Sequence, residues 1–343
     1  MVDDMTSTPL GRDFFERLPK VELHVHLEGS IPPSTMRALA EKRGRDLDRD
    51  ARWALLQGGR YKDFSEFVQV WTLISELLRE YRDYEIIARA LAGEMVRQNI
   101  RHAEVLFSPT LDSVKHLDPV GIAAAAASGF QAEGEQLSVR LIADIVRDNG
   151  PAEAQALVEA LAAGRPPLLA GIGIGGSENR FPPEPFAAAF QKARAAGFRT
   201  EAHAGETAGP DSIWGALRTL RVERINHGTR AREDAFLLRS LRERRIPVAS
   251  CPTSNLRLAV VPRLEEHPVG PFLADGLAVN LATDDPAVFG ADLAGEYAAA
   301  AAAFGWNQED IRRLLHNALE AAWCGEDVKS RLRSEIDGFL ASA

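Results

Sequence analysis

Eight short apolar segments recur along the 343-residue chain, and sequence of helical character follows each of them. Apart from a longer helical stretch after the first, they recur at about 20 to 40 residues, which is typical of βα units with a parallel sheet. Eight such units predict an α/β fold, the (β/α)8 or TIM barrel. The segments are residues 20–26, 103–107, 139–145, 168–174, 198–203, 224–227, 246–250 and 277–283.

Two helical additions to this barrel are predicted. Residues 45–98 have a mostly helical pattern with a break at Gly58-Gly59. Within them an apolar stripe lines one helix face, and we expect core packing for it, with a lid over a pocket as the second interpretation. The stripe consists of Phe64, Phe67, Val68, Trp71 and Ile74. Residues 306–343 are expected to form a pair of closing helices. No Pro/Gly/Ser-rich linker is evident, so residues 1–343 are expected to be a single barrel domain.

Composition excludes several classes of function. The net charge is −9 and no basic cluster is backed by aromatic residues, so nucleic acid is not an expected partner. No apolar run approaches the ~18 residues of a membrane helix, and no secretory signal is visible at the N-terminus. The two cysteines, Cys251 and Cys324, are far apart in the sequence and form no disulfide pattern. A reducing cytoplasm is therefore the expected location. The expected partners are a small molecule and, at most, a second copy in a homodimer.

Histidines gather where the predicted strands end. His24 and His26 are two residues apart in the first strand and therefore share one of its faces. His203 and His227 end the fifth and sixth strands, and a parallel barrel brings all such ends to one rim. We assign the other four histidines to helices or loops as surface or structural residues; they are His102, His116, His267 and His316.

This set of residues predicts a metal site. His24, His26 and His203 supply three nitrogens, Asp284 at the end of the eighth strand supplies an oxygen, and a further position is left for water, as catalytic zinc requires. Zinc brings the pKa of its bound water toward ~7. The fourth strand, residues 168–174, contains no lysine that could be carbamylated to hold a second metal. We therefore expect one Zn²⁺ per chain.

Other groups at the same rim are candidates for proton transfer and substrate contact. Glu206, in the loop after His203, is expected to be an acid/base group. His227 is expected to orient or deprotonate the water, with a structural role as the alternative. Asp285 is a candidate substrate contact or, alternatively, a helix N-cap. Gly175 and Gly176 allow a backbone to approach a planar ligand closely.

The motifs that carry these residues resemble those of the adenosine deaminase family within the amidohydrolase superfamily. The matching segments are LPKVELHVHLEGS, AEVLFSP, GIGIGGSE, EAHAGE, INHG, ASCPTSN and NLATDDPA, in that order over nearly the whole chain. The resemblance implies a mononuclear zinc hydrolase that replaces the 6-amino group of a purine with oxygen and releases ammonia.

The resemblance also implies roles for individual residues. His24, His26, His203 and Asp284 correspond to the zinc ligands, and Glu206 to the proton donor to purine N1. His227 and Asp284 correspond to the groups that position and activate water. The expected substrate contacts are His26, Glu28, Gly176 at N3 and Asp285 at N7.

Several departures from the family pattern concern substrate choice. Glu28 stands where adenosine deaminases usually have the Asp that meets the ribose 5′-hydroxyl, Gly173 and Ser177 replace two usual acids, and Leu106 replaces an Arg. The leading hypothesis is a deaminase of a 6-aminopurine nucleoside, adenosine or a derivative. A 6-amino-6-deoxyfutalosine deaminase of menaquinone biosynthesis and an adenine deaminase remain alternatives. A catalytically silent purine-binding relative is disfavoured, because no ligand is missing.

Overall fold

The computed structural model describes residues 10–62, 64–111, 114–132 and 134–342. Its eight strands pair in parallel, each with the next in chain order. A parallel bridge between Val25 and Asp284 connects the region after the eighth strand to the first, which closes the barrel. The predicted (β/α)8 fold is confirmed. The strands are β1 (Lys20–His26), β2 (Ile100–Phe107), β3 (Ser138–Val146), β4 (Leu169–Gly175), β5 (Arg199–Ala204), β6 (Arg224–His227), β7 (Val248–Ser250) and β8 (Val279–Leu281).

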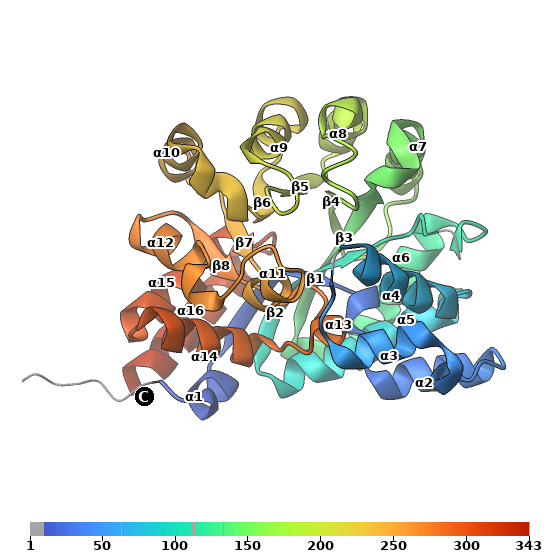
Figure 1. Ribbon diagram of the computed structural model, residues 1–343, viewed down its shortest axis with the longest axis horizontal. Coiled ribbons are helices and arrows are strands. Elements are labelled where there is room, and N and C mark those ends of the chain that lie inside the picture. Colours follow the sequence, from blue (N-terminus) through green and yellow to red (C-terminus); the bar gives the residue numbers. More distant parts are fainter. Residues whose placement is uncertain (1–9, 63, 112–113, 133, 343) are drawn as a thin grey trace, which may run out of the picture.

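Helices surround the strands (Figure 1). Those that follow β2 to β7 are α6 (Pro119–Gln131), α7 (Gly150–Gly164), α8 (Ala187–Ala195), α9 (Pro210–Gly215), α10 (Ala235–Glu243), α11 (Pro252–Arg257) and α12 (Val269–Ala274). After β8 come α13 (Pro286–Phe289), α14 (Leu293–Phe304) and the predicted closing pair, α15 (Gln308–Ala321) and α16 (Glu326–Ser342). Within the described ranges, no helix combines the length and apolarity that crossing a bilayer demands.

The segment between β1 and β2 is helical, as predicted. It contains α2 (Pro33–Lys42), α3 (Ala51–Gly58), α4 (Phe64–Leu77) and α5 (Tyr81–Arg97), while α1 (Arg12–Arg17) precedes β1. The predicted break is at the end of α3, where Gly59 has a φ of 59°, a left-handed conformation that glycine adopts without steric cost. A second break, between α4 and α5, was not predicted.

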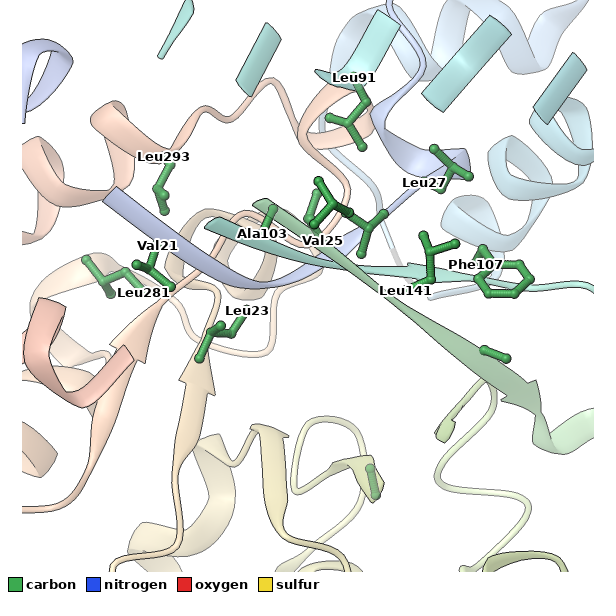
Figure 2. Packing of buried hydrophobic residues seen from close by; sticks show 14 of the residues in the cluster. Val21, Leu23, Val25, Leu27, Leu91, Ala103, Phe107, Leu141, Leu281 and Leu293 are labelled. Carbon is green, nitrogen blue, oxygen red and sulfur yellow. The ribbon is translucent and has the colours of Figure 1, made fainter. Parts of the chain in front are cut away.

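Strand β1 is buried on both faces. Val21, Leu23 and Val25 belong to the continuous apolar core, and Figure 2 shows them among the apolar side chains of neighbouring elements. The alternate residues of β1, His24 and His26, point to the opposite face, toward the barrel interior. One face of this strand therefore packs in the apolar core, and the other face carries the two histidines.

A buried ion network lies in the interior, apart from the four histidines at the strand ends. The Arg224 guanidinium donates to Glu201 and Glu104, each at 2.8 Å, and all three side chains are fully or almost fully buried. The Trp323 ring, between α15 and α16, lies 4.3 Å from the Arg224 guanidinium carbon. The closing helices therefore seal that end of the barrel.

The assignment of His102 to a helix or loop is wrong, because β2 begins at Ile100 rather than Ala103. Ile100 and His102 pair with Lys20 and Val21 of β1, so the ladder of hydrogen bonds extends further than the apolar pattern indicates. The His102 side chain is fully buried, with Nε2 3.3 Å from an oxygen of Glu104.

Candidate active site

The four predicted ligand residues meet at the carboxyl ends of the strands. His24 and His26 come from β1, His203 from β5, and Asp284 from the segment after β8; their potential ligand atoms all lie within 4.8 Å of one another. The Nε2 atoms of His24 and His26 are 3.2 and 3.4 Å from Asp284 Oδ1. The Nε2 atoms of His26 and His203 are 3.1 Å apart. The fold thus brings this set together as predicted.

The polar atoms of this cluster are those expected of a cation site. His24 is fully buried, and within the described residues neither of its ring nitrogens has a partner in good hydrogen-bond geometry, despite the nearby Asp284 oxygen. Burial lowers the pKa of His24 to about 3, so the imidazole is neutral and able to act as a ligand. His203 Nδ1 lies 3.0 Å from the Ile174 carbonyl, which leaves its Nε2 to face the cluster. Three nitrogens and one carboxylate suit zinc.

A second group, Glu206, His227 and Asp284, adjoins the first, again with atoms within 4.8 Å. Glu206 Oε1 is 3.7 Å from His227 Nδ1. Burial raises the pKa of Glu206 to about 7, so a substantial fraction of this carboxyl keeps its proton at neutral pH. His227 and Asp284 have φ values of 65° and 66°, a strained backbone conformation that recurs at functional sites.

Glu178 holds the loop that carries Glu206. Its two carboxylate oxygens accept hydrogen bonds from four successive backbone N–H groups at 2.6 to 3.0 Å, those of Gly205, Glu206, Thr207 and Ala208. Glu178 was not predicted as a functional residue, although the GIGIGGSE segment contains it. Its buried carboxylate fixes the backbone from which the Glu206 side chain projects.

Helix α11 orients the groups on the opposite side. The Ser254 hydroxyl donates to Asp284 Oδ2 at 2.7 Å. The Asn255 side chain lies between two histidines, 3.3 Å from His227 Nδ1 and 3.0 Å from His267 Nε2. His267 is fully buried and acts here as a structural residue. Ser254 and Asn255 were noted only as parts of the CPTSN motif.

A cavity of about 330 Å³ opens beside the cluster of proposed metal ligands. Phe67, Val68 and Trp71 of α4 line it, and the Trp71 ring lies 5.8 Å from that of His26. Phe67 and Trp71 also pack against the core, as expected, whereas Val68 is 42% exposed and does not. The stripe is therefore not simply core, because α4 lies across the barrel mouth rather than against its outer wall. Ile74 is fully buried, as expected.

The predicted substrate contacts differ in position. His26, Gly176 and Asp285 line the cavity. Asp285 precedes α13, yet its side chain makes no capping hydrogen bond there, and its Oδ1 has no partner among the residues that the structure describes. Glu28 is fully buried and is not among the lining residues; its Oε1 accepts from the Ser108 N–H at 2.9 Å. Its predicted contact with substrate stays a prediction.

Fold and cluster together define a class of protein. A closed parallel barrel with three histidines and an aspartate at its strand ends is a metal-dependent hydrolase site.

Comparisons with known proteins identify the family. The family model described as adenosine deaminase matches residues 19–339. The chain is 36% identical to an aminodeoxyfutalosine deaminase of Streptomyces avermitilis over 97% of this chain and 95% of that protein. It is 35% identical to an adenine deaminase of Agrobacterium fabrum, over 93% and 98% of the two chains. A zinc-bound amidohydrolase structure from Burkholderia ambifaria is 31% identical, with a TM-score of 0.88 over 100% and 98%. The chain belongs to the adenosine deaminase family and is a metal-dependent purine deaminase.

Proposed function

We propose that this chain hydrolyses the 6-amino group of a purine nucleoside, adenosine or a derivative, to give the 6-oxopurine and ammonia. It would do so with one Zn²⁺ bound by His24, His26, His203 and Asp284, and as a single barrel domain over residues 1–343. The observation that carries the proposal is the juxtaposition of Glu206 and His227 with the ligand cluster. A proton donor and a water-orienting base next to a cation site are the groups that hydrolytic deamination requires.

In this proposal a zinc ion, Glu206 and His227 share the steps of the reaction. A zinc ion at this site supplies a Lewis acid that makes water a nucleophile near neutral pH. Glu206 donates its proton to purine N1, which makes C6 more electrophilic. His227 takes a proton from the attacking water, whose oxygen becomes bonded to C6. The C6–N bond then breaks, and the amino group leaves with that proton as ammonia. The C6 oxygen gives its remaining proton back to Glu206 as the C6=O bond forms, which restores the protonated carboxyl.

Binding contacts hold the purine plane in this proposal. Asp285 donates a hydrogen bond from its protonated carboxyl to N7, since burial raises the pKa of this group well above its usual range. The backbone at Gly176 contacts N3, and His26 contacts the ring while serving as a ligand. Gly176 has a φ of 92°, which favours glycine there and leaves the backbone bare toward the cavity.

The size of the cavity favours a nucleoside over a free base. The lining residues extend from the histidines to Thr110, Asn149 and Leu258, beyond what a purine ring alone would contact. A volume of about 330 Å³ also lies within the usual range of sites that enclose a whole small molecule.

A second candidate substrate is aminodeoxyfutalosine, because the chain is 36% identical to a protein named aminodeoxyfutalosine deaminase. The wall formed by Phe67, Val68 and Trp71 would suit an aromatic or apolar extension of the nucleoside.

A substrate panel tests both candidates. Zinc-quantified enzyme is assayed for ammonia release from adenosine, deoxyadenosine, adenine and aminodeoxyfutalosine. We expect the highest kcat/KM on a nucleoside or its 5′ derivative. Preference for free adenine would reject the nucleoside assignment while leaving the deaminase intact, and no ammonia from any of the four would reject the proposed function.

A further inference from the structure

Two deeply buried charged side chains, Glu178 and Arg147, hold the backbone around Glu206. They are 3% and 1% exposed, and neither is among the residues that line the cavity. Both bind the main chain, because Glu178 accepts from N–H groups and Arg147 donates to carbonyl oxygens. Charged residues are almost never buried to this extent unless their polar atoms are satisfied, and here the backbone satisfies them. The proposed reaction uses neither side chain.

The hydrogen bonds of Glu178 enclose the N–H of the proposed proton donor. Its Oε1 accepts from Gly205 at 2.6 Å, and its Oε2 accepts at 2.8 to 3.0 Å from Glu206, Thr207 and Ala208. Successive N–H groups that point to one anion form a concave segment, and Gly205, with a φ of 74°, supplies the left-handed residue that this shape uses. The backbone on both sides of Glu206 is therefore bound to a single carboxylate.

Arg147 holds the segment that carries Glu178. Its guanidinium donates to the carbonyl oxygens of Gly175 and Phe181, each at 3.0 Å, and these two residues stand on either side of Glu178 in the chain. It also donates to the His203 carbonyl at 2.8 Å. One side chain thus ties both ends of residues 175–181 to the residue that precedes the loop of the proton donor.

Glycines at the end of β4 allow this close approach to the end of β3. A Cβ at Gly175 would lie 2.5 Å from an oxygen of Asp144, and a Cβ at Gly176 would lie 2.5 Å from an oxygen of Asp148 and 3.3 Å from Cγ of Arg147. A side chain at either position would push the two strand ends apart. The arrangement around Arg147 therefore depends on both glycines.

We propose that Arg147 and Glu178 are positioning residues for the proposed reaction, because together they fix the place of the proton donor Glu206 relative to the metal ligand His203. This pair is called the brace below. The inference rests on the proposed function, which makes Glu206 the proton donor. A displacement of about 1 Å at a reacting group can cost about a hundredfold in rate, so the brace should act on kcat.

The test introduces Glu178→Gln into the zinc-loaded full chain, both alone and together with Glu206→Gln. Glutamine keeps the size of the side chain, but its NH2 group cannot accept a hydrogen bond from a backbone N–H. Glu265→Gln is the matched control, because Glu265 is exposed and outside the cavity. The assay measures ammonia release from whichever of the four purines in the substrate panel gives the wild type its highest kcat/KM. Zinc content is determined for each variant.

Glu178→Gln alone should lower kcat by about a hundredfold and change KM by less than about threefold, because Glu178 does not line the cavity. Zinc should stay near one per chain. In the Glu206→Gln background the proton donor is already absent, so the same substitution should change kcat by less than about threefold. An equal fall in both backgrounds is the mark of a purely structural role and overturns the inference. An unchanged kcat, or a loss of zinc together with activity, overturns it as well.

Arg147→Lys tests the other half of the brace. Lysine keeps the positive charge but replaces a planar fork of donors with one compact ammonium, which cannot bind three separated carbonyl oxygens in the same way. We expect kcat to fall by about tenfold, again only where Glu206 is present. If Glu178→Gln does not fold, this variant decides by the same comparison, and equal losses in both backgrounds overturn the inference.

Backbone hydrogen exchange gives a measurement that needs no activity. Amides 205–208 should exchange slowly in the wild type and at least about tenfold faster in Glu178→Gln, with the amides of β1 unchanged. Rapid exchange of residues 205–208 in the wild type overturns the brace. If the wild type releases no ammonia from any of the four purines, the proposed function fails. Exchange then decides separately: faster exchange confined to residues 205–208 supports the brace, and unchanged exchange overturns it.

Discussion

At the scale of the residue, the site combines groups that are each unfavourable by themselves. In the described part of the chain, His24 is buried without a hydrogen-bond partner in good geometry, Glu206 is a buried carboxyl, and Asp284 has a positive φ. Such features cost on the order of 1 to 3 kcal/mol each and persist only where the surrounding structure or a ligand compensates. Here Glu178 and Ser254 fix two of these groups through short hydrogen bonds.

The proton donor gives the first prediction. Glu206→Gln keeps the size of the side chain and removes the acid, so kcat should fall by about 10²- to 10⁴-fold. Zinc content should stay near one per chain, because Glu206 is not among the four proposed ligands. Glu243→Gln, an exposed change at the end of α10, is the control. A Glu206→Gln enzyme with near-normal turnover removes the proton-donor role.

At the scale of the element, α4 has a role that its sequence pattern does not distinguish from core packing. Its apolar face is divided, with Trp71 and Phe67 toward the cavity and Ile74 in the core. Helix α14 likewise makes a contact that its sequence pattern does not reveal. Its buried Glu296 accepts a hydrogen bond from the Thr253 N–H at the start of α11. Both contacts join elements that are distant in the chain.

The cavity wall gives the second prediction. Trp71→Ala should raise KM by about tenfold, or ~1.4 kcal/mol, with little loss of zinc, because it removes an apolar contact to the substrate rather than a ligand. Phe236→Ala is the matched control, since Phe236 is 76% exposed on α10. Steady-state kinetics measure the change; an unaltered KM together with a lower unfolding temperature would assign Trp71 to packing alone.

Glu296 gives a prediction about pH. Burial raises its pKa from 4.5 to about 8, so between these values the folded chain holds a proton that the unfolded chain releases. The contribution of Glu296 to stability is full below pH 4.5 and is lost as the pH rises through 8.

Replacing it with Gln removes this titration. The quantity to compare is the free energy of unfolding of Glu296→Gln minus that of the wild type, measured by urea unfolding. This difference should be more favourable to the variant at pH 8 than at pH 5, by on the order of a few kcal/mol. The same relative stability at both pH values would show that Glu296 does not titrate in this way.

At the scale of the whole molecule, the barrel brings residues from β1, β5 and the segment after β8 to one rim. His24 and Asp284, the most distant pair, are 260 positions apart in the chain. Asp284, one of the proposed metal ligands, is also the residue that pairs with Val25 in the bridge that closes the sheet. Binding of a cation should consequently stabilise the closed barrel.

Metal removal tests this coupling. The zinc-loaded chain should melt in one calorimetric transition, as expected of a single domain, and chelation should lower its midpoint by several degrees and abolish activity. A ligand at about a thousandfold above its Kd contributes about 4 kcal/mol. Added zinc should restore both properties. Two separate transitions would contradict the single-domain proposal, and an unchanged midpoint after verified zinc loss would contradict the coupling.

The barrel and the ligand cluster could be predicted from the amino-acid pattern alone. Eight alternating segments leave few arrangements for a parallel sheet, and in a closed barrel the strand ends must meet, so His24, His203 and Asp284 converge without knowledge of any distance. The alternation within β1 likewise assigns His24 and His26 to one face.

Which surfaces face the cavity could be learned from the three-dimensional structure but not from the pattern. The structure moved His102 into a strand, directed Trp71 toward the site, buried Glu28 beneath it, and brought Asp144 over the side-chain-free surface of β4. Local spacing fixes the face of an element on which a side chain lies. What that face meets depends on strand register and on how helices distant in sequence pack, and neither is encoded in any single stretch of the chain.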